Sequence, residues 1–282
     1  MLPLASLGST GLTVSQLTLS ARSFAGPVGP MSDAMRPEDV QRAFHELGVR
    51  SFVVTPAMSE QLEGVKRLAR EHREELCIIS LLTLPLAGRV RAYAHRLARK
   101  LETDRLDVLL MGWVRSAWSL RESVWGAMLE LKEAGAARAI GFSIHDRALA
   151  NQLAHALHPD VMMIRYNAAH RGAEEEIFAK LPHPRPGIIA YTATRWGELL
   201  IPRPDLGFPV PMRAPECYAF SLAHPAVDTV LAGVRRYAEL EEDATRLAPL
   251  EPERYLEVCR FGVAVREAAP RHPAGFMFPS RG

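Results

Sequence analysis

The sequence lacks any apolar run long enough to cross a membrane. Its longest uninterrupted apolar stretches have the length of a β-strand, well short of the roughly 20 residues that a transmembrane helix needs. The N-terminus also lacks the cationic start and long apolar core of a secretory signal peptide. We therefore expect a cytoplasmic protein with no membrane partner.

A charge excess of either sign is also missing. The 34 lysine and arginine residues nearly balance the 32 aspartate and glutamate residues, and both kinds are spread along the chain. The sequence contains neither a basic block nor a basic stripe interleaved with aromatic residues. Such features mark nucleic-acid-binding surfaces, so nucleic acid is not an expected partner.

Cysteine is scarce. The three residues of this type, Cys77, Cys217 and Cys259, are far apart, and their spacing is not that of metal ligands. An odd number also argues against a disulfide framework. We expect buried or free thiols and no metal site, because an unpaired cysteine usually behaves as a small buried hydrophobic residue.

What the sequence does contain is a regular alternation of strand and helix patterns. The chain has 282 residues, 48% of them hydrophobic, enough for one large α/β barrel or for two ordinary domains. Short apolar or β-branched runs predict the strands, and segments with helical apolar spacing separate them. The predicted strands cover residues 16–21, 51–55, 76–82, 106–111, 138–143, 161–165, 187–192 and 228–232. The predicted helices cover residues 37–47, 60–70, 90–100, 121–134, 147–157, 173–181 and 237–247.

This alternation favours a (β/α)₈ TIM barrel. Strands that are buried on both faces and separated by helices favour a parallel sheet, and eight such units close naturally as a barrel. Residues 7–15 have the glycine-centred turn and β-branched flanks of an N-terminal β-hairpin. A doubly wound open sheet is the alternative, but the first strand is not followed by a Gly-x-Gly-x-x-Gly turn. We expect a single domain over residues 1–282, with a long proline-rich loop over 201–215 and a C-terminal tail from about residue 266.

An ordered set of short segments resembles the aldo-keto reductases. Residues 7–15 read LGSTGLTVS, residues 106–110 read LDVLL and residues 133–143 read EAGAARAIGFS. The later segments are Tyr166-Asn167, Ala190-Tyr191-Thr192, residues 196–200 (WGELL), residues 224–227 (HPAV) and residues 231–233 (LAG). The likeness runs from about Leu4 to Ala248. It implies the barrel fold, a dinucleotide or another small molecule as the partner, and carbonyl reduction as the activity of the family.

Four positions depart from the catalytic pattern that the resemblance implies. In the family a tyrosine donates the proton as hydride reaches the carbonyl carbon, a lysine and an aspartate tune the tyrosine, and a histidine orients the substrate. The resemblance places Val53 at the aspartate, Met58 at the tyrosine, Leu81 at the lysine and Gly112 at the histidine. None of these side chains exchanges a proton. A buried lysine or aspartate without its partner carries an uncompensated desolvation cost, so the loss of one favours the loss of the others.

The positions that hold the cofactor in the family are partly retained. Ser143 matches the serine at the nicotinamide amide, whereas Ile144 and Met163 replace an asparagine and a glutamine there. Tyr191 matches the aromatic residue that stacks under the nicotinamide ring. The other matches are Thr192 at the pyrophosphate, Gly233 at the last strand end, Arg235 and Arg236 near a 2′-phosphate, and Glu242 with Asp243 at the adenine. NADP(H) is therefore the expected cofactor type; the alternative is that Tyr191 serves in packing and the arginines are solvated loop charges.

Several residues follow the C-terminal ends of the predicted strands, where (β/α)₈ barrels build their sites. His145 is a candidate substitute proton donor because imidazole titrates near neutrality, and a structural hydrogen-bonding role is the alternative. Arg165 and Arg195 are candidates for contact with an anionic ligand; otherwise each would pair with a local carboxylate or cap a loop. The remaining members of this group are Trp113, Asn167, His170 and Trp196.

Three functions stay open at this stage. The first, which we favour, is a divergent aldo-keto reductase-like protein that has lost the four proton-handling groups and serves in ligand binding or regulation. The second is an active NADP(H)-dependent oxidoreductase that acts on small carbonyl compounds with a non-standard proton donor such as His145. The third is a scaffold or subunit barrel whose apolar tail segment, residues 275–279, forms the contact. The substrate and the oligomeric state are not determined by the sequence.

Overall fold

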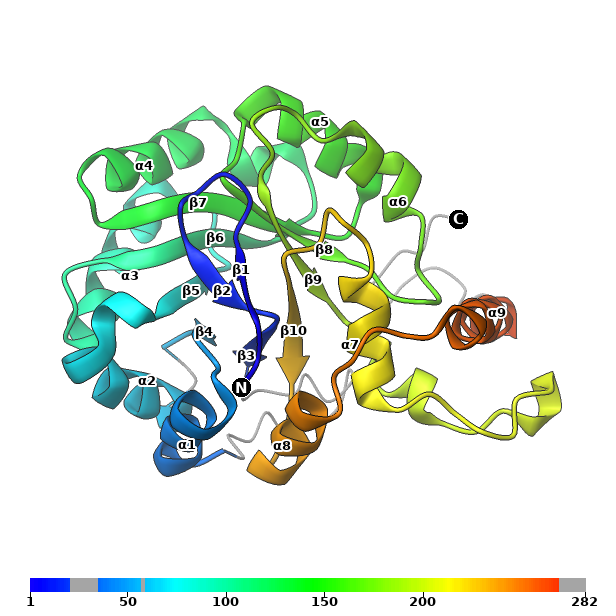
Figure 1. The fold of residues 1–282 in the computed structure, drawn as a ribbon. Helices are drawn as coiled ribbons and strands as arrows, with labels where there is room; N and C mark the ends of the chain where they lie inside the picture. Colours follow the sequence, from blue (N-terminus) through cyan, green and yellow to red (C-terminus); the bar gives the residue numbers. More distant parts are fainter. Residues whose placement is uncertain (21–34, 57–58, 269–282) are drawn as a thin grey trace.

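Eight parallel strands form a closed barrel with helices around its outside (Figure 1). The structure, a computed structural model, describes residues 1–20, 35–56 and 59–268. Neighbouring strands follow the order β10-β3-β4-β5-β6-β7-β8-β9 around the barrel. Their bounds are β3 (Leu17–Ser20), β4 (Ser51–Val54), β5 (Cys77–Leu82), β6 (Leu106–Val114), β7 (Ala137–Ile144), β8 (Val161–Arg165), β9 (Gly187–Tyr191) and β10 (Thr229–Gly233). The predicted (β/α)₈ TIM barrel is confirmed.

The helices lie between successive strands in the chain, and one follows the last unit. They are α1 (Pro37–Leu47), α2 (Ser59–His72), α3 (Ala87–Leu101), α4 (Glu122–Glu133), α5 (Arg147–Leu157), α6 (Ala173–Glu176), α7 (Ala214–Leu222), α8 (Tyr237–Thr245) and α9 (Pro252–Ala268). Short 3₁₀ turns are η1 (Arg73–Glu75), η2 (Ala117–Leu120), η3 (Phe178–Lys180), η4 (Glu198–Leu200) and η5 (Pro204–Leu206). No helix in the described ranges combines the length and the apolar composition that crossing a bilayer requires.

Helix α1 shows how the local sequence sets an element. Pro37 occupies the first turn, where its missing N–H costs nothing. The carboxylate of Asp39 accepts a hydrogen bond from the Arg36 backbone N–H at 3.2 Å, which satisfies a donor at the helix start. Gly48 follows the last residue with a φ of 78°, in the left-handed region that ends many helices. The sequence predicts both bounds of this helix correctly.

Two predicted segments differ from the structure, and a third lies partly outside the described residues. The helix expected over residues 173–181 is shorter, because Ile177 leaves the helical backbone region and divides it into α6 and η3. Helices α7 and α9 are not predicted, and α7 begins inside the segment expected to be a loop over residues 201–215. The C-terminal tail is described only as far as Ala268, so its apolar segment 275–279 lies outside the described residues.

The N-terminal hairpin covers the end of the barrel where the strands begin. Its strands are β1 (Leu4–Ser6) and β2 (Thr13–Ser15), which pair antiparallel, so the expected hairpin is confirmed with its turn over residues 7–12. Leu7, Leu12 and Val14 are buried against the residues inside the barrel. The backbone N–H of Gly8 donates to the carboxylate of Asp228 at 3.0 Å, across 220 positions of the chain.

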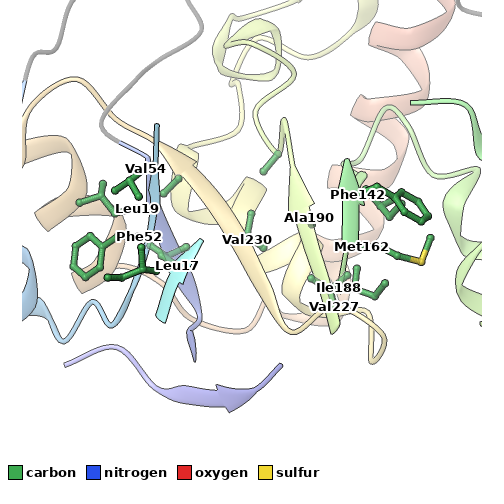
Figure 2. Close-up of a cluster of buried hydrophobic side chains, with 14 of the residues drawn as sticks. Leu17, Leu19, Phe52, Val54, Phe142, Met162, Ile188, Ala190, Val227 and Val230 are labelled. Atoms are coloured by element: carbon green, nitrogen blue, oxygen red, sulfur yellow. The ribbon is translucent and has the colours of Figure 1, made fainter. Parts of the chain in front are cut away.

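The apolar side chains form two separate clusters. The outer core lies between the strands and the surrounding helices, and Figure 2 shows a part of it that includes Leu17, Phe52, Phe142 and Ile188. The inner core fills the barrel itself, because alternate residues of each strand point inward. Its members are Leu7, Leu12, Val14, Val53, Cys77, Ile79, Val108, Leu110, Ala139, Val161, Met163, Ile189 and Tyr191, with Leu81 and Leu231 packed against them.

All three cysteines are free thiols in the structure. Cys77 and Cys217 are buried, and Cys259 is half-buried on α9. Burial raises the pKa of the Cys77 thiol well above its ordinary value. This thiol is therefore a hydrophobic filler of the inner core rather than a nucleophile.

Candidate functional site

The C-terminal ends of the strands surround one end of the barrel, which we call the mouth. All eight strands are parallel, so their last residues share this end. These residues are Ser20, Val54, Leu82, Val114, Ile144, Arg165, Tyr191 and Gly233. Loops at this end carry the sites of (β/α)₈ barrels.

Three of the four positions matched to proton-handling groups meet on the inner wall near the mouth. Val53 on β4 belongs to the inner core, and Leu81 on β5 packs against that core. A Cβ atom added at Gly112 on β6 would lie 3.4 Å from Cδ2 of Leu81 and 3.4 Å from the carbonyl oxygen of Leu82. These three positions therefore lie on consecutive strands and present no ionisable group. Met58 lies outside the described residues.

Tyr93 does not supply the missing hydroxyl to this wall. It projects from α3 into the outer core, where its hydroxyl donates to the carbonyl oxygen of Leu81 at 2.7 Å. Burial raises the pKa of Tyr93 to about 12. The group is thus on the helix side of β5 and bonded to the backbone, away from the inner wall.

Ser143 and Tyr191 come together at the mouth end of the interior. Ser143 on β7 is paired in register with Met163 on β8, and both are buried. The hydroxyl of Tyr191 donates to the carbonyl oxygen of Ile144 at 3.1 Å. Burial raises the pKa of Tyr191 well above its usual range, so its hydroxyl is a hydrogen-bonding group and not an anion. The side chain of Ile144 packs in the outer core and faces away from the barrel interior.

The other residues matched to cofactor contacts are exposed around the start of α8. Gly233 ends β10 and is exposed, as are Arg235 and Arg236 after it. Arg236 pairs with Glu239 at 3.1 Å, and Glu242 pairs with Arg246 at 3.0 Å. Both pairs are in solvent and contribute little to stability. Thr192 lies apart from this group, and its hydroxyl donates to the carbonyl oxygen of Tyr191 at 2.7 Å.

Asp243 is a buried carboxyl group beside this exposed group. Burial, with the nearby charges of Glu242 and Glu239, raises the pKa of Asp243 to about 7. The folded-state pKa lies above the unfolded value of 3.8, so the native state binds the extra proton between about pH 4 and pH 7. The free energy of unfolding contributed by this group therefore falls as the pH rises through that range.

Asp243→Asn should stabilise the protein clearly more at pH 8 than at pH 5. The amide cannot ionise, so the variant avoids placing a carboxylate in a buried site beside two others. We expect the free energy of unfolding to rise by about 2 kcal/mol at pH 8, roughly half of the value that corresponds to a pKa shift of this size. Urea unfolding at both pH values measures it, with Glu253→Gln, an exposed residue of α9, as the control. An equal gain at pH 5 and pH 8 would contradict a buried, titrating carboxyl group.

The remaining candidates from the sequence also lie at the mouth. Burial, with the charges of Arg165 and Arg115, lowers the pKa of His145 to about 4. The His145 ring meets the Tyr191 ring edge-on at 5.3 Å between centroids. Trp113 and Trp196 are 47% and 40% exposed, so both present aromatic surface beside the strand ends. Arg195 pairs with Glu198 at 3.1 Å, as the alternative interpretation of this residue expects.

One charged residue near the mouth is missed by the sequence interpretation. Arg266 lies on α9. Burial lowers the pKa of His170 to about 3, and the charges of Arg165, Arg195 and Arg266 act in the same direction. The segment that forms α9 follows the region of family resemblance and shows no strong amphipathic pattern. The position of α9 beside β8 and β9 depends on tertiary packing, which a local sequence pattern cannot predict.

Comparisons with known proteins agree on one family. A model of the Aldo/keto reductase family matches residues 21–200. Methylglyoxal reductase DkgA of Escherichia coli O157:H7 is 33% identical over 112 residues, which are 38% of this chain and 40% of that reductase. The matched part is thus less than half of this curated relative.

Solved structures share the fold over nearly the whole chain. The aldo-keto reductase AKR11C1 from Bacillus halodurans, in its holo form, superposes with a TM-score of 0.77 at 17% identity, over 93% of this chain and 96% of that one. Its apo form gives a TM-score of 0.73 over the same shares of both chains. At this identity the likeness supports the fold alone.

Proposed function

Because the chain belongs to the aldo/keto reductase family, we propose that it is a divergent member that binds an NADP(H)-type dinucleotide and is a very poor carbonyl reductase. The observation that carries the proposal is the wall formed near the mouth by Val53, Leu81 and Gly112. By resemblance these positions belong to an aspartate, a lysine and a histidine. None of Val53, Leu81 and Gly112 has a side-chain group that could hold or relay a proton.

Proton supply decides how fast such a site can reduce a carbonyl group. A bound nicotinamide supplies the hydride, and the oxygen that becomes a hydroxyl must also receive a proton. A positioned general acid contributes about 10²–10⁴-fold to the rate. Water would have to replace it at a wall where the side chains of Val53 and Leu81 offer no hydrogen bond to orient it.

The residues fit a dinucleotide better at its phosphate end than at its nicotinamide amide. Arg235 and Arg236 are exposed after β10, and guanidinium groups suit phosphate oxygens. The Tyr191 hydroxyl is held by its hydrogen bond to the Ile144 carbonyl oxygen, and the ring presents an aromatic surface. Met163, beside Ser143, has a thioether that is a weak acceptor and no donor, so only the serine can bond well to an amide.

An active oxidoreductase that uses His145 as its proton donor is the second candidate. The edge-on contact with Tyr191 places His145 at the mouth, where a substitute donor would be needed. Against it, a pKa of about 4 means that the imidazole is neutral at pH 7. A neutral imidazole N–H is a weak acid, so this residue supports slow proton transfer only.

NADPH should quench the tryptophan fluorescence of the native protein more strongly than NADH does at the same concentration. Trp113 and Trp196 are partly exposed at the mouth, and the arginines after β10 favour a 2′-phosphate. The double variant Arg235→Gln/Arg236→Gln should weaken NADPH binding by roughly tenfold or more and leave NADH binding unchanged. The control is Arg70→Gln on α2, an exposed residue paired with Glu102. Unchanged fluorescence and an unchanged melting temperature at saturating NADPH would contradict the proposal.

A further inference from the structure

Helix α3 carries a row of cationic side chains on its outer side. Arg89, Arg96 and Lys100 are seven and four residues apart, a spacing that aligns them along one side of a helix. Arg99 lies next to Lys100, and all four residues are exposed. We call these four residues the α3 cationic face. The face is about 16 Å long, at roughly 1.5 Å of helix per residue.

The α3 cationic face has no acidic partners. Most lysine and arginine side chains in the described part of the chain form ion pairs, and Arg91 of the same helix pairs with Glu130 of α4. Glu102, which follows the helix, pairs with Lys66 and Arg70 of α2, each at 2.8 Å. Within the described ranges, no carboxylate lies within ion-pair distance of the α3 cationic face. Its positive charge is therefore not neutralised by the protein.

The stability of the helix does not explain this concentration of charge. Residues 76–101 contain no aspartate or glutamate. The first turn of α3 also has no acidic residue, although the positive end of the helix dipole favours one there. Arg89 lies in that turn, where its charge is unfavourable to the helix. The four cationic positions are separated along the sequence, so only the helical period brings them into one row.

Two exposed leucines continue the row at the mouth end of α3. Leu86 is the N-cap residue and lies three positions before Arg89, on the same side of the helix. The carbonyl oxygen of Leu84 accepts a hydrogen bond from the Leu86 backbone N–H at 2.9 Å, so a tight turn holds the two leucines together. Leu84 and Leu86 are 53% and 47% exposed. Apolar surface in water has an unfavourable free energy, which contact with hydrocarbon removes.

The loop after the next strand has the same character. It follows β6, which pairs with β5, so the two loops are neighbours at the mouth end of the barrel. Trp118 on η2 is 58% exposed, and the Arg121 guanidinium lies 3.9 Å from the centroid of its ring. Arg115 is exposed in the same loop, and residues 108–121 contain no aspartate or glutamate. Two consecutive loops thus combine exposed apolar side chains with positive charge.

We propose that the α3 cationic face, together with Leu84, Leu86 and Trp118, binds the surface of an anionic lipid bilayer. Lysine and arginine side chains are attracted to anionic head groups, and leucine and tryptophan side chains enter the boundary between head groups and acyl chains. A bilayer offers both environments on one broad surface, which suits a convex helix and two loops. The phosphates of a nucleic acid would engage the cations but leave both leucines in water.

Binding of this kind is peripheral to the membrane. The expectation of no membrane partner concerns spanning segments, which a protein bound at the bilayer surface does not need. The lipid surface also goes beyond the proposed dinucleotide binding and does not depend on it. The arginines proposed to contact a 2′-phosphate follow β10, whereas α3 follows β5.

Co-sedimentation with lipid vesicles tests the proposal. At low ionic strength, the native protein should bind phosphatidylcholine vesicles that contain about 30% phosphatidylserine but not vesicles of phosphatidylcholine alone, and salt should weaken the binding. Arg89→Gln/Arg96→Gln/Lys100→Gln should lower the partition coefficient at least roughly tenfold. Leu84→Ser/Leu86→Ser, which keeps every charge, should lower it roughly fivefold or more.

The matched control removes three positive charges from the other side of the barrel. Lys180→Gln/Arg213→Gln/Arg260→Gln changes exposed residues of η3, the loop before α7 and α9, and it should bind the vesicles as the native protein does. All variants should keep the native melting temperature and the native affinity for NADPH, so the outcome is independent of the proposed dinucleotide site.

Several results would overturn the proposal. They are equal binding to vesicles with and without phosphatidylserine, unchanged binding of the α3 triple variant, unchanged binding of the double leucine variant, and an equal loss in the control variant. Equal affinity for a DNA duplex of about 20 base pairs would also overturn it, since the face would then attract any polyanion.

Discussion

A variant with four restored side chains should reduce small aldehydes with NADPH about 10²–10⁴-fold faster than the native chain. The variant carries Val53→Asp, Met58→Tyr, Leu81→Lys and Gly112→His. The expected gain comes from a positioned general acid whose proton affinity a neighbouring lysine and aspartate adjust. The rate of NADPH oxidation measures it, against a panel of aldehydes and ketones.

The geometry of the inner wall favours this restoration. Val53 and Leu81 lie on adjacent strands inside the barrel, so an aspartate and a lysine introduced together can neutralise each other. The Cβ atom of a residue introduced at position 112 would lie 3.4 Å from Leu81 and from the Leu82 carbonyl oxygen, which is ordinary van der Waals contact. Leu81→Lys alone should destabilise the fold, since it buries a charge with no partner.

Two controls separate proton supply from other causes. The same variant with Met58→Phe in place of Met58→Tyr has an aromatic ring but no hydroxyl, and it should stay at the native rate. The native chain is expected to be slow with every compound in the panel. Fast native turnover that His145→Ala abolishes would show that the proposal of a lost proton relay is wrong.

Gly141→Ala should prevent folding or reduce the free energy of unfolding by more than about 4 kcal/mol. Gly141 lies on β7 and pairs with Val161 on β8. An added Cβ atom would lie 1.7 Å from the carbonyl oxygen of Val161 and 2.7 Å from its carbonyl carbon. Both atoms are backbone in a closed ladder, so relief requires the two strands to separate or to shift register.

Gly126→Ala is the matched control for this substitution. Gly126 lies inside α4, where an added Cβ atom would meet nothing within 4 Å. Alanine in a helix interior should stabilise the protein by about 0.5–1 kcal/mol. Urea unfolding followed by circular dichroism measures both variants. Native-like stability of Gly141→Ala would mean that β7 and β8 do not approach as closely as the structure describes.

The strands and their inward-facing residues could be predicted from sequence because both depend on short-range patterns. A buried parallel strand is a continuous apolar run bounded by polar residues, as residues 161–164 show between Asp160 and Arg165, and its side chains alternate with a period of two. Once Leu81 and Gly112 are placed on their strands, their inward direction follows. In the structure Val53 belongs to the inner core and Leu81 packs against it, which agrees with this alternation.

Helix α7 and the position of α9 could not be predicted in this way. Helix α7 buries Cys217, Tyr218 and Phe220 on several sides, so it has no polar face to give a helical period. Arg165 and Arg195 can be placed at strand ends from the sequence. Their burial, and the arrival of Arg266, depend on how α9 packs on the loop after β8.

The bond between Gly8 and Asp228 has a consequence for biosynthesis. It joins positions 220 residues apart, and β10 closes the barrel by pairing with β3 near the start of the chain. On the ribosome, the edge of β3 therefore has no native partner until almost the whole chain has emerged. An exposed strand edge is a template for pairing with other chains. We therefore expect nascent chains of this protein to be more prone to pairing with other chains than chains whose contacts are local.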